Sequence, residues 1–403
     1  MSKNAFVFVV CGDDEHINTL NYSIKALRSY SRKDIYVVTD RSRNEVDIEH
    51  DNVLDIQTPK EFSNHQASIY LKTGLHKFLP KGNNYCYLDS DIIALSEDCD
   101  KIFDEFIPPI RFAPDHCRLP AFSPSAIKCS CYERNEREKA ELRALLEKFD
   151  LSEQLSGYQK EHHNELLKII YKVRSKPLRN IKTILKYLFA FNRFNLNDTY
   201  YFKRKTRTWH LQETDEPILF DFRLIIKNIE RSSTFKWSRL RIAWINEEGK
   251  NIFNLTCHHL HEAIQSKFDI KVRKGNWQHW NGGVFLFNDQ SHDFLEAWFN
   301  KTMEIFKDDN WKTRDQGTLV ATAWEFQLQN QPILDKKWNF IADYNNQFLE
   351  LNPSTGYISD DSFKNKYKPV FIHVYHNFGM KGWEVWDWIE KKLRDTSADN
   401  ENN

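Results

Sequence analysis

Apolar runs and helical periodicity alternate at the start of the chain. Residues 5–11 form an almost fully apolar run that predicts a buried strand, and Leu20, Ile24 and Leu27 then recur at helical spacing. A second apolar run within residues 34–39 predicts another strand. The strand–helix–strand order predicts a parallel pair joined by a right-handed crossover, which is the repeating unit of an α/β fold.

A third strand is predicted by the apolar residues 85–88, after a helix expected over residues 71–79. This strand leads directly into the tripeptide Asp89-Ser90-Asp91. Ligands of open α/β sheets bind beyond the carboxyl ends of the strands. We therefore expect a functional site at this tripeptide.

The character of the sequence changes between residues 128 and 250. Charged helical stretches such as 133–149, followed by a basic segment, predict a mainly helical insertion that contacts an acceptor or a membrane. Apolar runs at 280–288 and 369–374 then predict further core strands, with a helix over 292–306 between them. The expected parts are one half of the core at 1–127, the insertion at 128–250, the rest of the core at 251–392 and a disordered polar tail at 393–403.

Composition narrows the possible partners. Lysine plus arginine and aspartate plus glutamate number 57 each, so no global charge draws the chain to nucleic acid. Aromatic residues make up 14% of the chain, which suits a protein that stacks bases or sugars, although packing accounts for most of them. The seven cysteines are scattered, and the sequence has no signal-like or membrane-spanning segment, so we expect a cytoplasmic protein.

Asp89 and Asp91 are the central chemical feature of the sequence. Two carboxylates one residue apart at a strand end can share Mg²⁺ or Mn²⁺, and such an ion can neutralise the leaving diphosphate of a nucleotide sugar. A D-x-D sequence also occurs by chance, and the alternative is a solvated loop. Apolar residues on both sides favour the metal site, because acidic groups within buried runs are costly unless they coordinate something.

The segment Tyr87-Leu88-Asp89-Ser90-Asp91-Ile92-Ile93 resembles the D-x-D strand of GT-A glycosyltransferases, especially those of family 8. Further similar segments follow in the family's order, roughly over residues 5–110 and 275–390. The resemblance implies a GT-A fold, that is, a Rossmann-like mixed sheet with a largely helical inserted subdomain. It also implies a metal-dependent, retaining enzyme that transfers a hexose from a nucleotide-diphosphate sugar, UDP-linked, to a carbohydrate or glycolipid acceptor.

The resemblance also implies roles for individual residues. Donor contacts are expected from the loop after the first strand, from a basic residue, from the D-x-D tripeptide and from a closing H-x-x-G motif, namely Cys11, Asp13, Asp14, Lys72, Asp89, Ser90, Gly379 and Lys381. Catalytic roles beside the donor sugar are expected for Asn281, Asp315 and Gln316, and Trp338-Asn339 is similar to the family's W-N pair. The expected metal ligands are Asp89, Asp91 and His376. His373 is a rival third ligand, but the spacing to Gly379 favours His376.

Two other functions stay open. A sugar-phosphate nucleotidyltransferase has a related architecture, but it would normally carry a glycine-rich basic loop after its first strand. Here that loop is Gly12-Asp13-Asp14-Glu15, which is acidic and poor in glycine. A catalytically silent sugar- or nucleotide-binding module would need the same donor site without turnover.

A zinc site is considered and set aside at this point. Cys257, His258, His259 and His261 lie close together in the sequence, with Cys129 and Cys131 far upstream. This arrangement lacks the regular paired spacing of structural zinc sites, so we expect helix-surface or acceptor-side residues there.

The stretch 168–209 is strongly basic, with Asp198 as its only acidic residue, and apolar residues are interleaved with the basic ones. A basic amphipathic helix of this kind can lie on an anionic membrane or present a groove to an acidic acceptor. A solvated basic helix packed on the rest of a neutral protein is the alternative. The first of these would place the protein at the inner face of a membrane.

Overall fold

The computed structural model describes residues 3–149, 155–175, 177–220, 222–273, 275–361 and 364–401. The chain divides into two compact units. Met1–Cys129 and Cys257–Asn403 form the first, called the core unit here. Ser130–Thr256 form the second, called the inserted unit.

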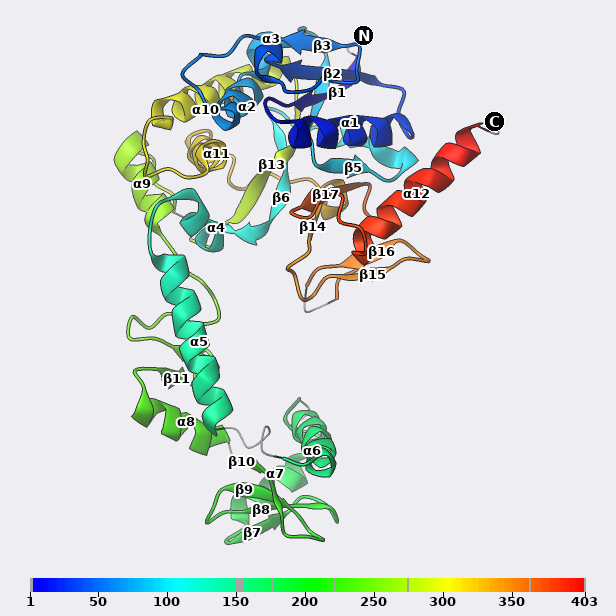
Figure 1. Cartoon of the computed structure of the whole chain (residues 1–403). Coiled ribbons are helices and arrows are strands. Elements are labelled where there is room, and N and C mark those ends of the chain that lie inside the picture. The colour runs from blue at the N-terminus through cyan, green and yellow to red at the C-terminus, as the bar shows by residue number, and fades with distance from the viewer. Residues whose placement is uncertain are drawn as a thin grey trace. The chain divides into compact units, whose positions relative to one another are not determined.

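A six-stranded mixed sheet organises the core unit (Figure 1). In spatial order its strands are β3 (Val53–Asp55), β2 (Asp34–Thr39), β1 (Asn4–Val9), β4 (Asn84–Leu88), β13 (Gln278–Phe287) and β6 (Arg111–Arg118). The strands from β3 to β4 are parallel, whereas β13 runs antiparallel to both β4 and β6. Val7 pairs with Tyr36 and with Tyr87, so β1, β2 and β4 end at the same edge.

Alternation along β1 explains how helices cover both faces of this sheet. Phe6 and Phe8 pack in one cluster with Leu20 of α1 (Asp14–Arg28), while Val7 and Val9 pack in another cluster on the opposite face. The helices of that second cluster are α2 (Asn64–Thr73), α3 (Leu75–Phe78), α4 (Leu119–Ala126), α9 (His259–Phe268), α10 (His292–Ile305) and α11 (Arg314–Glu325). The expected parallel pair of β1 and β2 is confirmed, as is the mixed α/β fold class.

A smaller three-stranded sheet packs beneath the D-x-D segment. Its strands are β14 (Phe340–Asp343), β17 (Phe371–Tyr375) and β5 (Ile92–Ala94). β17 is parallel to β14 and antiparallel to β5, with His373 opposite Ile92. Helix α12 (Glu384–Glu401) covers this sheet through apolar residues such as Trp386 and Ile389. Residues 393–401, expected to be a disordered tail, therefore continue a helix instead.

Short elements complete the core unit. They are the hairpin strands β15 (Glu350–Asn352) and β16 (Tyr357–Ser359), and the 3-10 turns η1 (Arg41–Arg43), η2 (Glu97–Glu105), η4 (Asp289–Ser291) and η5 (Lys336–Trp338).

The inserted unit combines helices with two small antiparallel sheets. Its helices are α5 (Cys131–Phe149), α6 (Gly157–Ser175), α7 (Ile181–Phe189) and α8 (Phe222–Ser232). One sheet has the order β10 (Pro217–Phe220), β9 (Thr208–Leu211), β8 (Tyr200–Lys203) and β7 (Arg193–Asn195), and the other pairs β11 (Lys236–Ser238) with β12 (Ala243–Ile245). The insertion, expected to be mainly helical, thus contains two small sheets beside its helices. Within the ranges that the structure describes, no helix has both the length and the apolar character needed to cross a bilayer.

Candidate functional site

Polar residues from several strands converge at the carboxyl edge of the large sheet. Asp89 directly follows β4, and its backbone N–H donates to the carbonyl of Gly283 in β13 at 2.9 Å. Asn281 of β13 lies opposite Ala113 of β6. Because β13 runs antiparallel to β4, its amino-terminal half reaches the edge at which β4 ends. The site expected at the D-x-D tripeptide is therefore built by neighbouring strands.

A histidine completes a group of potential metal ligands with the carboxylate pair. The ligand atoms of Asp89, Asp91 and His373 lie within 4.8 Å of one another. His373 Nε2 is 3.2 Å from Asp91 Oδ2, because β17 places this residue beside β5, which begins right after the D-x-D tripeptide. Two carboxylates and one imidazole form a set of donors suited to a divalent cation.

The structure groups His373, and not the expected His376, with the carboxylate pair. His376 lies beyond the end of β17 with an exposed side chain and a left-handed backbone, at φ 59°. Its ring packs against that of Tyr375, with 4.0 Å between the centroids. The spacing to Gly379 favours His376, whereas strand pairing brings His373 to Asp91.

Asn339 orients the imidazole of His373. Its Oδ1 lies 3.2 Å from His373 Nδ1, and its Nδ2 donates to Asn281 Oδ1 at 3.0 Å. Only 1% of Asn339 is exposed, so this chain of hydrogen bonds is shielded from water. Since the carbonyl oxygen accepts, Nδ1 carries the hydrogen and Nε2 is directed at the carboxylates, as in a metal-binding histidine.

Asp91 and His373 each shift the pKa of the other. Burial alone would raise the pKa of Asp91, but the adjacent imidazole of His373 outweighs burial and lowers it. For His373, burial alone would lower the pKa, whereas Asp91, with further help from Asp89 and Asp115, raises it. A metal ion at this position would compete with protons for these ligand atoms.

Lys72 links the carboxylate pair to helix α11. Its Nζ lies 3.2 Å from Asp89 Oδ1 and 3.3 Å from Asp315 Oδ2, and the residue is 8% exposed. Burial would lower the pKa of Lys72, but the two carboxylates raise it, so the amine is held as a cation. Tyr87 also donates its hydroxyl hydrogen to Asp89 Oδ1 at 2.5 Å. Asp89 Oδ1 is thus shared by two donors.

Gly283 is required by the close approach of three side chains. A Cβ at this position would lie 2.7 Å from Asn281 Oδ1, 2.9 Å from Asp89 Oδ2 and 3.1 Å from His373 Cε1. These distances are shorter than normal contacts, so any side chain here would displace a potential ligand.

Asp115 belongs to the site but is absent from the sequence-based expectations. Its carboxylate accepts from Asn281 Nδ2 and from the backbone N–H of Cys117, at 3.0 and 3.1 Å. Burial would raise its pKa, but His116 and further partners lower it, so the side chain is a carboxylate. Strand β6, which carries Asp115, has Pro114 and a polar second half, so hydrophobic periodicity gives no sign of it.

The expected catalytic residues lie around this centre. Asp315, in the first turn of α11, faces Lys72. Gln316 Oε1 lies 3.1 Å from Nε2 of His279, a buried histidine whose ring stacks on Phe122 at 3.9 Å. Burial lowers the pKa of His279. Asn281 holds Asp115, Asn339 and Gly283 together by hydrogen bonds, which makes it a positioning residue.

The residues expected to contact the nucleotide are more dispersed. Cys11, Asp13 and Asp14 follow β1 at the edge where β4 ends, and Asp13 caps α1 by accepting from the N–H of His16. The carbonyl of Ser90 accepts from the hydroxyl of Ser23 at 2.6 Å. Gly379 and Lys381 lie in the exposed segment between β17 and α12.

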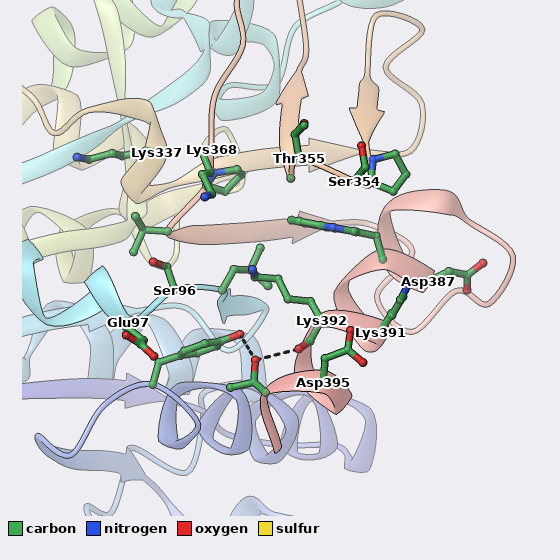
Figure 2. Close-up of a pocket in the computed structure, with 18 of the residues that line it drawn as sticks. Ser96, Glu97, Lys337, Ser354, Thr355, Lys368, Asp387, Lys391, Lys392 and Asp395 are labelled. Atoms are coloured by element: carbon green, nitrogen blue, oxygen red, sulfur yellow. Dashed lines mark hydrogen bonds between the residues drawn. The ribbon is translucent and has the colours of Figure 1, made fainter. Parts of the chain in front are cut away.

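A large cavity of the core unit lies elsewhere. It measures about 1330 Å³ and is bounded by the turn between β15 and β16, by residues next to β5 and β17, and by α12. Figure 2 shows that lysine and carboxylate side chains line it, among them Lys337, Lys368, Lys392, Glu97 and Asp395. None of the three potential metal ligands lines this cavity. Ligand geometry, and not cavity size, therefore locates the candidate site.

The solved structures that resemble this chain include glycosyltransferases, with low sequence identity and low TM-scores. No family model matches the chain, and no curated protein matches it. The apo bifunctional glycosyltransferase WbbM is 12% identical with a TM-score of 0.40, over 97% of this chain and 50% of that one. GlyE of Streptococcus pneumoniae is 11% identical with a TM-score of 0.38, over 99% of this chain and 64% of that one.

A third structure is the galactosyltransferase LgtC in complex with donor and acceptor sugar analogues. It is 9% identical with a TM-score of 0.39, over 97% of this chain and 95% of that one. The chain thus spans half to two thirds of the length of WbbM and GlyE, but nearly all of LgtC.

Proposed function

We propose that the chain is a glycosyltransferase of the GT-A type, which binds Mn²⁺ or Mg²⁺ through Asp89, Asp91 and His373 and uses a nucleotide-diphosphate sugar, UDP-linked, as donor. The observation that carries the proposal is the grouping of these three ligands at the carboxyl edge of the sheet, with Asn339 orienting the imidazole. A metal site at a strand edge of an α/β sheet fits the binding of a nucleotide diphosphate.

The donor set favours manganese over magnesium. Mg²⁺ is held mainly by oxygen atoms and keeps several waters, whereas Mn²⁺ accepts an imidazole beside carboxylates more readily. When bound, such an ion supplies Lewis-acid stabilisation of the charge that develops on the leaving diphosphate.

The chain's own residues would orient the donor around that centre. Lys72 provides a fixed cation between Asp89 and Asp315, so it balances the negative charge of the site while the donor binds. Asp315 and Gln316 lie in the first turn of α11 next to this cation and are the residues we place beside the donor sugar. The resemblance to family 8 further suggests transfer with retention of configuration, which the anomeric proton signals of the product would report.

The proposal is tested by turnover of nucleotide sugars. The full chain is screened with UDP- and GDP-linked sugars and Mn²⁺ by thermal shift, and release of the nucleotide is then measured for the donors that bind. We expect metal-dependent hydrolysis or transfer that Asp91→Asn abolishes and that the exposed-site variant His376→Ala retains. Binding of a donor without any turnover would identify a silent module, and full activity in chelator would contradict the metal assignment.

The acceptor side of the proposal concerns helix α7 and its flanks in the inserted unit. Leu178, Phe189 and Phe191 are 87%, 76% and 92% exposed, so large apolar side chains face water here. Ile181, Leu185 and Leu188 follow helical spacing and are exposed as well. We infer that this surface contacts an anionic membrane, where the acceptor would be a glycolipid.

The neighbouring charges support that choice of partner. Lys182 and Lys186 are exposed next to the apolar side chains, and Tyr187 attaches the helix to the small sheet through Phe194 and Phe202. Basic residues beside an exposed apolar stripe are typical of helices that lie in a membrane interface.

Co-sedimentation with vesicles tests the membrane contact independently of turnover. We expect binding to vesicles that contain anionic lipid, reduced at least roughly tenfold in the double variant Lys182→Glu/Lys186→Glu. Leu240→Ser is the matched control, because Leu240 is 95% exposed elsewhere in the same unit. Equal binding of the charge-reversed variant, or no binding of the unmodified chain, would refute the membrane contact and leave the donor site untouched.

A further inference from the structure

We propose that the core unit holds a zinc ion beside the start of α9, bound by Cys129, Cys257 and His259. The sequence argued against zinc, because these residues lack the regular paired spacing of structural zinc sites and Cys129 lies far upstream of Cys257. The fold of the core unit brings these residues together. This site is separate from the carboxylate–histidine group and does not depend on the proposed transferase activity.

The distances within the core unit fit a tetrahedral ion. The sulfur atoms of Cys129 and Cys257 are 3.8 Å apart, and Cys257 Sγ lies 3.2 Å from His259 Nδ1. Two thiolates bound to one zinc at about 2.3 Å, at a tetrahedral angle, lie about 3.8 Å apart, and a thiolate and an imidazole nitrogen lie about 3.5 Å apart. A disulfide would need about 2 Å between the sulfur atoms. The spacing therefore matches ligands of a shared ion.

The types of ligand in the core unit favour zinc. Two sulfur atoms and one imidazole nitrogen belong to the ligands that zinc takes in proteins. Soft thiolates select zinc over the Mg²⁺ or Mn²⁺ proposed for the carboxylate site.

Neighbouring groups stabilise the ligands in this arrangement. Ser123 donates its hydroxyl hydrogen to Cys257 Sγ at 3.1 Å and accepts from the backbone N–H of Leu260 at 3.0 Å. Cys257 also donates its own N–H to the carbonyl of Pro120 at 3.1 Å. Both Cys257 and His259 lie at the amino-terminal end of the ten-residue helix α9, where the helix dipole favours a thiolate. These neighbouring residues hold the ligand side chains in position by hydrogen bonds, as the residues around known metal sites do.

The position of the site in the chain suggests what the ion does. Cys129 is the last residue before the inserted unit and Cys257 is the first residue after it. An ion bound by both residues would hold the two ends of the insertion together. The core unit would then keep its fold whether or not the inserted residues are well ordered.

Cobalt substitution is the direct test, because it reports sulfur ligands. The full chain, purified without a histidine tag and without chelator, should retain about one zinc per chain by mass spectrometry. After exchange with Co²⁺ it should show a thiolate-to-cobalt charge-transfer band and the visible bands of a tetrahedral ion. The carboxylate–histidine group contains no sulfur, so it cannot produce the charge-transfer band.

Variants assign the ligands. We expect Cys257→Ser to lower the retained zinc at least roughly tenfold and to remove the charge-transfer band. His258→Ala, a neighbour outside the ligand group, and Asp91→Asn, in the other site, should keep both signals. If Cys257→Ser does not fold, the unmodified chain still decides the question: a folded protein that retains no zinc and gives no charge-transfer band with Co²⁺ overturns the proposal.

Discussion

Replacing Asn339 by alanine tests how the fold prepares the metal site. Asn339 is almost fully buried and touches no expected substrate atom, yet its carbonyl oxygen holds Nδ1 of His373. In Asn339→Ala the imidazole loses this partner and can rotate or change tautomer, so Nε2 is no longer directed at Asp91. The change therefore alters the orientation of a ligand and not its identity.

The expected loss follows from the hydrogen bonds that the variant removes. Loss of a group that orients a metal-binding histidine typically weakens metal affinity by about 10- to 100-fold, or roughly 1.4 to 2.7 kcal/mol. His373 Nδ1 would also be left as a buried donor without an acceptor, which costs about 1–3 kcal/mol of folding stability. Asn281 Oδ1 keeps its hydrogen bond from the N–H of Gly283, so it adds little to this cost.

Mn²⁺ binding, measured from the paramagnetic resonance signal of the free ion, separates the two effects. Asn135→Ala is the matched control, because Asn135 is another buried asparagine whose Nδ2 donates to the carbonyl of Ile252, within the inserted unit. We expect a similar loss of stability in both variants but weaker Mn²⁺ binding only in Asn339→Ala. If folded Asn339→Ala binds Mn²⁺ as tightly as the unmodified chain, the proposed role of Asn339 is wrong.

Three further predictions concern other parts of the core unit. Gly283→Ala should weaken Mn²⁺ binding at least roughly tenfold, since its Cβ would lie 2.9 Å from Asp89 Oδ2; calorimetric titration measures this. Lys72→Met should lower the free energy of unfolding by about 3 kcal/mol, because buried Asp315 and half-buried Asp89 lose their cation, and melting curves should show that Mn²⁺ stabilises this variant more than the unmodified chain. Burial alone would raise the pKa of Asp40, but hydrogen bonds from neighbouring hydroxyl and N–H groups lower it to about 2. Since this carboxylate stabilises the fold above its unfolded pKa, Asp40→Asn should cost about 2 kcal/mol near neutral pH, and urea titrations should show the difference closing as the pH falls from about 4 to about 2.

The sequence predicts the regular part of this molecule well. The strand at residues 34–39 was expected at the bounds it has, and the apolar residues 85–88 lead into Asp89 as predicted. Both are buried strands with near-continuous apolar runs, which is the strongest pattern that a parallel sheet leaves in a sequence.

Long-range pairing accounts for what the sequence does not reveal. The sequence spacing favours His376 over His373 as a ligand, and only the register of β17 with β5 brings His373 to Asp91. Asp115 lies on an irregular strand with a proline, so its approach to Asn281 has no local signal. These contacts depend on the whole sheet and not on a segment.

The residues proposed to bind zinc were likewise not predictable from their spacing in the sequence. Their sequence spacing, with Cys129 more than a hundred residues before Cys257 and His259, differs from familiar zinc motifs. Cys257 lies near Cys129 because helix α9, which follows Cys257, packs in the core cluster that also includes Leu119 and Phe122 of α4. Tertiary packing thus creates a ligand group that spacing alone argued against.

The most direct test of the central claim is the affinity for Mn²⁺ measured with and without UDP in two histidine variants. The account predicts that UDP tightens Mn²⁺ binding to the unmodified chain, that His373→Ala loses both the affinity and this coupling, and that His376→Ala keeps both. Loss of the coupling in His376→Ala with an unaffected His373→Ala would contradict the site described here.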